Sequence, residues 1–241
     1  MFKHKAILII HGFAGGVYDE EYLINYLEFK RNFDVFSFTL PGHDVKNRKY
    51  STEDRWIKKS EKELKMLLDH GYKEIYVIGH SMGGVIATYL AKKYSEVKKL
   101  VLVAPAFTSL GSKDQGGVFG ALFKIPDLIK AYSYQELLTR VNKLPLSSEK
   151  EFMNLITHHK HDIDEIRVPI LFIHGSADQV VPVKSSITLY NKVKNKKKKL
   201  IIIDGYYHDV FKGRKVERIC KEIKKFLVMK NFMIKSEQIN L

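Results

Sequence analysis

Short runs of apolar residues alternate along this chain with longer segments that repeat apolar residues at helical spacing. The short runs have the length of strands and lie at residues 6–10, 35–39, 74–78, 100–104, 170–173 and 200–203. Alternation of apolar strands with helices is typical of a mostly parallel sheet that is covered by helices on both faces. The predicted fold class is therefore α/β.

The helical segments carry recognisable start and stop signals. Segment 52–70 begins with a capping threonine and two acids, and Gly71 follows as its stop. Segments 183–193 and 216–229 repeat apolar residues along one face. The tail at 231–241 loses this periodicity, so we expect it to fray.

The alternation stops between residues 107 and 167, where no convincing strand occurs. This stretch opens with a glycine-rich patch and scatters aromatic residues through short helical pieces. Long inserts in compact domains tend to be lids, and ligands of open α/β sheets bind at the carboxyl ends of the strands. We expect one core built from residues 1–106 and 168–241, with 107–167 as a cap. A helical subdomain that touches no ligand is the alternative.

Composition narrows the class of protein. A chain of 241 residues with 45% hydrophobic and 28% charged residues can bury a sizeable core and is neither disordered nor membrane-like overall. The net charge of +14 has its densest run at Lys192, Lys194 and residues 196–199. We interpret this run as a solvated basic turn after a helix, where the macrodipole favours lysine. Weak attraction to anionic surfaces is the alternative, and specific nucleic-acid binding is not expected, because a bare charge run reads no bases.

Two further features bear on location. The apolar run at 6–10 is too short for an export signal or a membrane span, and no other stretch approaches that length. The single cysteine, Cys220, cannot form an internal disulfide. Both features favour a reducing cytoplasm. No residue pattern fixes an oligomeric state.

The most informative motif is GHSMGG at residues 79–84, which joins the predicted strand at 74–78 to a helical run. Its serine, Ser81, stands at the apex of a sharp turn, and only very small residues such as Gly79 and Gly83 let strand and helix pass closely there. The first N–H groups of the helix face any negative charge that grows beside the serine. This arrangement predicts acyl transfer.

A serine hydroxyl needs an imidazole to accept its proton, and the imidazole needs a carboxylate to orient it. Asp178 and His208 follow two successive predicted strands, at the same edge of the sheet as Ser81, and the order Ser, Asp, His fits this chemistry. Asp204 and Asp209 are competing acids, but they flank His208 and are typical of turns. We favour Asp178.

These motifs resemble those of the α/β-hydrolases, in particular the small capped bacterial carboxylesterases and monoacylglycerol-lipase-like enzymes. The resemblance spans nearly the whole chain and rests on HGF at 11–13, PGH at 41–43, GHSMGG at 79–84, Asp178 with Pro182, and His208. It implies that Ser81 is the nucleophile, that His208 is the general base and then the acid, and that Asp178 orients His208. It also implies an oxyanion hole formed by the backbone N–H groups of Phe13 and Met82.

The resemblance further implies a serine carboxylesterase that acts on short- to medium-chain acyl esters or monoacylglycerols, with no cofactor and no metal. The small apolar ester is the expected partner, and Phe13, Phe107, Phe119 and Phe123 are candidates for its acyl pocket, with core packing as the alternative. Another hydrolase on the same triad (a thioesterase, peptidase, carbon–carbon hydrolase or perhydrolase) stays open, as does a ligand-binding relative with little turnover.

The remaining histidines are interpreted as structural. His80 and His11 are expected to form hydrogen bonds, because one base suffices. The HHKHD run at 158–162, with Asp164, looks like a metal site, but its spacing matches no helical ligand pair and Lys160 would repel a cation. We expect a solvated end of the cap there.

Overall fold

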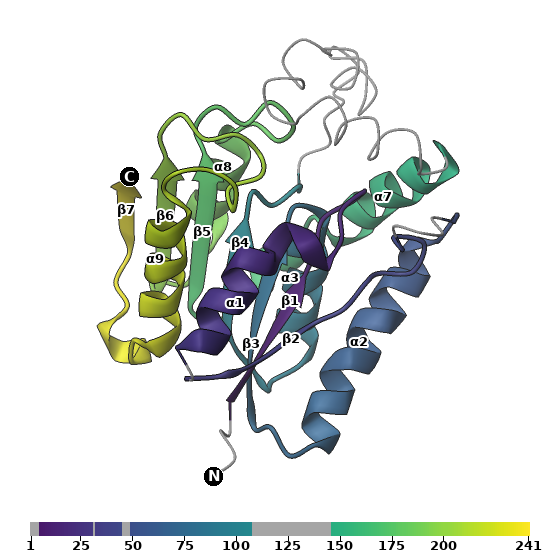
Figure 1. Ribbon diagram of the computed structural model, residues 1–241, viewed down its shortest axis with the longest axis horizontal. Coiled ribbons are helices and arrows are strands. Elements are labelled where there is room, and N and C mark those ends of the chain that lie inside the picture. Colours follow the sequence, from purple (N-terminus) through teal and green to yellow (C-terminus); the bar gives the residue numbers. More distant parts are fainter. Residues whose placement is uncertain (1–4, 31, 45–48, 108–145) are drawn as a thin grey trace.

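The computed structural model describes residues 5–30, 32–44, 49–107 and 146–241. Within these residues, seven parallel strands form one sheet in the order β2-β1-β3-β4-β5-β6-β7 (Figure 1). The strands are β1 (Lys5–Ile10), β2 (Asp34–Ser37), β3 (Glu74–His80), β4 (Val97–Val103), β5 (Ile170–Gly175), β6 (Lys198–Ile203) and β7 (Glu237–Asn240). The predicted parallel α/β sheet is confirmed.

Helices cover both faces of the sheet (Figure 1). One face carries α1 (Glu21–Phe29) and α9 (Val216–Val228), and the other carries α2 (Glu53–Asp69), α3 (Met82–Lys93), α7 (Leu146–His159) and α8 (Lys184–Lys192). Short 3-10 turns lie at η1 (Val17–Glu20), η3 (Asp162–Glu165) and η4 (Asn231–Met233).

The sheet has two apolar faces, which explains the uninterrupted apolar runs of the sequence. In β1, Leu8 and Ile10 point into the core beneath α2 and α3, whereas Ile7 and Ile9 point into the core beneath α1 and α9. Successive side chains of a strand point to opposite faces, so a strand covered on both faces must be apolar throughout.

The predicted helices at 52–70, 183–193 and 216–229 are confirmed as α2, α8 and α9, with small differences at their ends. The Thr52 hydroxyl caps α2 by accepting a hydrogen bond from the N–H of Arg55 at 3.3 Å. Gly71 ends this helix with a positive φ of 87°, a conformation that glycine adopts without strain.

The predicted cap lies mostly outside the described residues. Of the segment 107–167, the structure describes Phe107 and residues 146–167. Residues 146–167 form α7, η3 and the connection to β5. Helix α7 packs against α2 and α3, and Phe152 and Leu155 enter the core there. The assignment of 107–167 as a cap stays a prediction.

The C-terminal tail corrects a prediction. Residues 231–241 do not fray: they form η4 and then β7, which pairs in parallel with β6. Ile234 is buried beneath α9, and the Tyr190 and Ser236 hydroxyls form a hydrogen bond of 2.7 Å. The sequence hides this strand because its side chains are mostly polar and exposed, so no apolar pattern marks it.

The basic run is also less solvated than predicted. Lys192, Lys194 and residues 196–197 are exposed, but Lys198 and Lys199 belong to β6. The Lys198 ammonium donates to the carbonyls of Tyr190 and Val193 at the end of α8, and Lys199 forms an ion pair with Glu237 of β7. These lysines therefore hold secondary-structure elements together.

Candidate active site

Ser81 occupies the sharp turn between β3 and α3. Its backbone has φ 52° and ψ −116°, a region that residues with a side chain rarely adopt. Hydrogen bonds hold the turn on both sides: the Ser81 N–H donates to the carbonyl of Val103, and the Ser81 carbonyl accepts from the N–H groups of Gly84 and Ala106. The strained conformation is therefore fixed by β4 and by the loop that follows it.

Close backbone contacts explain the glycines around Ser81. A Cβ atom at Gly79 would lie 2.2 Å from the carbonyl oxygen of Gly83, and one at Gly83 would lie 2.1 Å from the carbonyl oxygen of Ile10. Both distances are far below van der Waals contact, so the predicted need for very small residues at these positions is confirmed.

Asp178 and His208 meet across two loops at the carboxyl ends of β5 and β6. The Nδ1 atom of His208 lies 2.7 Å from Oδ2 of Asp178, and both side chains are buried. A Cβ atom at Gly175 would lie 2.1 Å from the carbonyl oxygen of Tyr206, so the two loops touch through backbone. Asp178, the acid favoured from the sequence, therefore contacts the imidazole of His208.

Asp178 is held as a carboxylate by several donors. Its Oδ1 atom accepts the backbone N–H groups of Val180 and Val181, both at 2.8 Å, and its Oδ2 atom lies 3.0 Å from Nε2 of His174. Burial by itself would raise the pKa of Asp178, but the charge of His208 and the hydrogen bonds from His174 and His208 outweigh burial and hold the pKa well below its usual range.

His174 was not predicted to belong to the site, yet its ring lies against the carboxylate of Asp178. Its ring is fully buried, and its Nε2 lies 2.8 Å from the carbonyl oxygen of Val181. A carbonyl only accepts, so Nε2 carries the proton and also faces Asp178. The Ser186 hydroxyl, 2.7 Å from Nδ1, then donates to the ring.

The loop after β1 lies against the Ser81 turn. A Cβ atom at Gly12 would lie 3.0 Å from Cβ of Ser81. His11 fixes this loop, since its Nε2 accepts the N–H of Leu40 at 2.9 Å and its Nδ1 lies 2.8 Å from the Gly12 carbonyl oxygen. Met82 is the first residue of α3, so its N–H has no acceptor within the helix. Gly12, the residue before Phe13, thus lies against the turn, and Met82 directly follows Ser81. An oxyanion hole formed by the N–H groups of Phe13 and Met82 stays a prediction.

The aromatic residues predicted for an acyl pocket have different positions. Phe13 stacks on Phe152 of α7, with ring centroids 5.1 Å apart, and contacts Trp56 edge-on. Phe107 is buried in the core on the face of the sheet that carries α2, α3, α7 and α8, while Phe119 and Phe123 lie outside the described residues. A substrate role for these four residues stays a prediction.

The histidine run at 158–162 separates into individual contacts. His158 faces Glu53 of α2 and His159 faces Asp162, each at 2.7 Å, and His161 lies 3.6 Å from Asp164. Within the residues the structure describes, no three histidine, cysteine or acidic side chains converge as a metal site would need.

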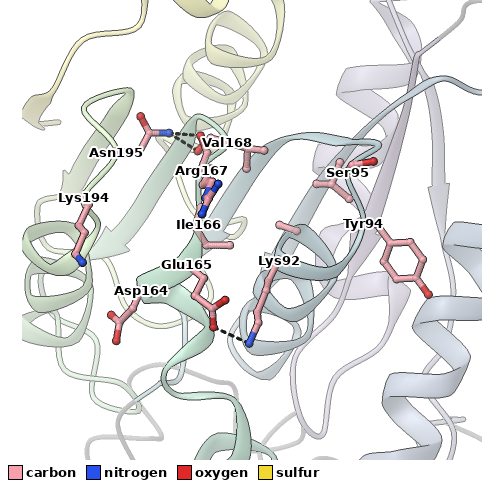
Figure 2. A pocket seen from close by; sticks show the side chains of 12 residues that line it. Lys92, Tyr94, Ser95, Asp164, Glu165, Ile166, Arg167, Val168, Lys194 and Asn195 are labelled. Carbon is pink, nitrogen blue, oxygen red and sulfur yellow. Dashed lines mark hydrogen bonds and ion pairs between the residues drawn. The ribbon is translucent and has the colours of Figure 1, made fainter.

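A cavity of about 850 Å³ lies at the opposite end of the sheet (Figure 2). The cavity is lined by residues at the start of β4, before the start of β5 and at the end of α3. Its lining carries both positive and negative side chains, and Lys92 forms an ion pair with Glu165 at 2.8 Å. The Asn195 amide donates hydrogen bonds to the carbonyls of Arg167 and Val168. Its lining includes neither Ser81, Asp178 nor His208.

A parallel sheet of this topology, with a strained serine after β3, an acid after β5 and a histidine after β6, places the chain among the α/β-hydrolases. The family model described as serine aminopeptidase, S33 (Hydrolase_4) matches residues 3–215, and the chain belongs to that family.

Several proteins similar to this chain are esterases or lipases by name. A carboxylesterase of Bacillus subtilis is 22% identical over 227 residues, which cover 92% of each chain. A thermostable monoacylglycerol lipase of Bacillus sp. (strain H-257) is 24% identical over 214 residues, covering 84% of this chain and 82% of the relative. The crystal structure of a Paleococcus ferrophilus monoacylglycerol lipase has a TM-score of 0.74 at 20% identity, covering 94% and 95% of the two chains. The chain is thus a member of a hydrolase family, and proteins similar to it include a carboxylesterase and monoacylglycerol lipases.

No helix in the parts of the chain described here is long and apolar enough to cross a membrane. Cys220 is buried in α9 as a free thiol.

Proposed function

We propose that this chain is a serine carboxylesterase that hydrolyses short- to medium-chain acyl esters or monoacylglycerols through an acyl-serine intermediate on Ser81. The observation that carries the proposal is the hydrogen bond between His208 and Asp178 at the same sheet edge as the strained Ser81 turn. The names of the relatives, carboxylesterase and monoacylglycerol lipase, favour an ester as the substrate.

In the proposed reaction, Oγ of Ser81 attacks the ester carbonyl carbon while Nε2 of His208 accepts the hydroxyl proton and then gives it to the leaving alcohol. Water next attacks the acyl carbon with the same nitrogen as base, and the acid leaves as Ser81 recovers its proton. Asp178 keeps the other ring proton on Nδ1, so that Nε2 presents its lone pair. The negative oxygen formed in each step would accept the N–H groups of Phe13 and Met82.

An apolar acyl group fits the surroundings of the oxyanion loop. Phe13 bridges the loop and α7 through its stack on Phe152, so an acyl chain beside it would contact aromatic carbon. We extend the proposal to residues 107–167 as a cap over this edge, with Phe119 and Phe123 as contributors to the acyl pocket.

The test is the initial rate of hydrolysis of p-nitrophenyl esters from acetate to palmitate. Ser81→Ala and His208→Ala are each expected to lose essentially all turnover, about 10⁶-fold if they act as in other serine hydrolases. Ser95→Ala is the matched control, because Ser95 lies beyond the far end of α3 beside the distant cavity. A rate maximum at one chain length, absent in Ser81→Ala, would size the acyl pocket. Equal hydrolysis by Ser81→Ala and the wild type would disprove the mechanism.

A peptidase is the second candidate, because the description of the matching family reads serine aminopeptidase. The same three residues would then cleave an amide, with His208 giving its proton to the leaving amine. Release of aminomethylcoumarin from N-terminally free aminoacyl derivatives, dependent on Ser81 and faster than any ester hydrolysis, would favour this candidate over the esterase.

A further inference from the structure

A second buried histidine–carboxylate pair lies beside the proposed triad. His80, the residue before Ser81, has its Nδ1 2.9 Å from Oε1 of Glu20, at the end of η1. Glu20 is completely buried and the His80 side chain is 7% exposed. The other ring nitrogen of His80, Nε2, lies 3.3 Å from the backbone carbonyl oxygen of His208. His80 therefore contacts the main chain of the proposed catalytic base.

The acceptors around His80 determine where its protons lie. Because the His208 carbonyl can only accept, Nε2 of His80 must carry a proton. A second proton lies between Nδ1 and Glu20, either on the ring, which gives an imidazolium and a carboxylate, or on the carboxyl group. The pair is electrically neutral as a whole in both arrangements. Loss of one proton would leave a buried carboxylate facing an imidazole lone pair, and this would break the contact with Glu20 or the one with His208.

Two rings and two further acids surround His80. Phe211 contacts its ring edge-on, and the His208 ring lies 5.2 Å away between centroids. Burial acts to lower the pKa of His80, but the hydrogen bond and charge of Glu20, with smaller contributions from Asp209 and Asp19, outweigh it and raise the pKa to about 9. The pair thus keeps its shared proton at neutral pH, as the contact between His80 and Glu20 requires.

We infer that His80, supported by Glu20, is a positioning residue that fixes the His208 main chain relative to Ser81. The inference rests on the proposed function, in which His208 serves Ser81 as its base. Asp178 holds the ring of His208 through Nδ1, and His80 holds its backbone. Because His80 and Ser81 are joined by one peptide bond, the nucleophile and its base are tied together through a single side chain.

The energetics favour this role over simple packing. Burying an ionisable pair costs desolvation, and apolar residues of similar volume often stabilise a fold equally well or better. A phenylalanine or leucine at residue 80 would pack against Phe211 but could not hold the His208 carbonyl. A misplacement of about 1 Å between reacting groups can cost up to about 10²-fold in rate, so a contact that fixes this geometry has a direct effect on turnover.

Two substitutions of His80 separate its contacts. The amide nitrogen of glutamine reaches close to the position of imidazole Nε2, whereas that of asparagine reaches only the position of Nδ1. His80→Gln therefore keeps a donor for the His208 carbonyl, and His80→Asn keeps a donor for Glu20 alone. We expect His80→Asn to lower kcat for p-nitrophenyl esters at least tenfold with KM within twofold, and His80→Gln to recover kcat to within about threefold of the wild type.

Controls separate positioning from stability. Leu27→Ala empties a buried site beneath α1 and is a matched destabilised variant that removes none of the hydrogen bonds of His80, Glu20 or His208. Rates are divided by the folded fraction from thermal melts. Equal kcat in His80→Asn and His80→Gln, or losses in both no larger than in Leu27→Ala, would overturn the inference. If neither His80 variant folds, Glu20→Gln, which can still hydrogen-bond to Nδ1, is expected to retain kcat while Glu20→Leu loses it, and equal rates in these two would overturn the inference.

A failure of the proposed function is distinguishable from a failure of this inference. If the wild type hydrolyses no ester, the rate at which a fluorophosphonate labels Ser81 still reports the His208-assisted nucleophile. Slow labelling in His80→Asn that His80→Gln restores would then support positioning, and equal labelling in both would reject it.

Discussion

The two buried histidine–carboxylate pairs of this molecule contain the same chemical groups and differ in how many donors their carboxylates receive. Asp178 accepts from two backbone amides and lies against two imidazole rings, and its pKa is held well below the usual range. In Glu20, Oε1 faces His80, while Oε2 has no hydrogen-bond partner among the residues described, and burial raises the pKa to about 7. Burial is nearly complete in both, so the number of donors decides which carboxylate stays firmly charged.

The difference fits two tasks. A carboxylate that stabilises an imidazolium during a reaction must remain ionised throughout, which several permanent donors ensure. A carboxylate that only keeps a neighbouring imidazole in place needs a single contact. We therefore expect substitutions at the two pairs to differ strongly in their effect on turnover.

Between the two carboxylates, the larger effect is expected for Asp178→Asn. An asparagine amide would donate to His208 where the carboxylate accepts, so the imidazole would turn its proton toward Ser81 and lose its function as base. We expect kcat for p-nitrophenyl esters to fall about 10⁴-fold, less than in Ser81→Ala or His208→Ala. Glu20→Gln, the equivalent isosteric change in the other pair, is expected to stay within about threefold, since a glutamine amide can still face Nδ1 of His80.

Comparable losses in Asp178→Asn and Glu20→Gln, each normalised to folded protein, would show that the two pairs have the same role. An unchanged rate in Asp178→Asn would mean that Asp178 does not orient His208, and Asp204 and Asp209 would again be candidates for that role.

An intermediate effect is expected for His174, which supports only the Asp178 pair. His174→Leu removes the donor at 3.0 Å from Oδ2 of Asp178 and leaves the Ser186 hydroxyl without its acceptor. We expect kcat to fall about tenfold, below the loss that a 1 Å misplacement causes, with KM nearly unchanged. His174→Gln, which can donate to Asp178, is the matched variant, and a kcat equal to that of His174→Leu would contradict the proposed support.

The smallest effect concerns stability, and here the two pairs predict opposite pH slopes. The pKa of Asp178 is lowered from 3.8 in the folded state, so its contribution to the free energy of unfolding is present above that pH and is lost as the pH falls. The pKa of His80 is raised from 6.5 to about 9, so its contribution is fully present below pH 6.5 and is lost as the pH rises through 9.

Urea denaturation at constant ionic strength measures both slopes. The stability advantage of the wild type over Asp178→Asn should shrink at acid pH. Its advantage over the double variant Glu20→Gln/His80→Asn, in which neither member of the pair titrates, should shrink between pH 6.5 and 9. An advantage over that double variant that grows with pH would reverse the assignment of the protons.

Much of the fold and the centre of the site could be predicted because their signals are local. Strands buried on both faces are continuously apolar, and the glycines beside Ser81 are required by backbone contacts of about 2 Å. Glu20 and His174 could not be found in this way. Glu20 lies in a polar stretch before α1, and its neighbours in the sequence do not indicate that it pairs with His80, which is distant in sequence on β3. His174 was visible beside Asp178, but the contact depends on how the loop after β5 turns back.

The edge strand β7 was missed for a different reason. Its residues, Glu237 to Asn240, are mostly exposed and polar, and only their pairing with β6 makes them a strand. Apolar periodicity reports burial, so it fails for an element that is held by backbone hydrogen bonds at the rim of a sheet.

The order of strands in the sheet also determines at which stage of folding the proposed catalytic residues come together. Strands β4 and β5 are neighbours although residues 104–169 separate them in the chain, and β6 docks on β5 in turn. Pairings this distant in sequence form slowly during folding. A growing or partly folded chain therefore presents the serine long before the acid and the histidine arrive. The rate at which ester hydrolysis returns during refolding would accordingly report when the last strands dock on the sheet. The proposed reaction can therefore be used to measure the final step of folding.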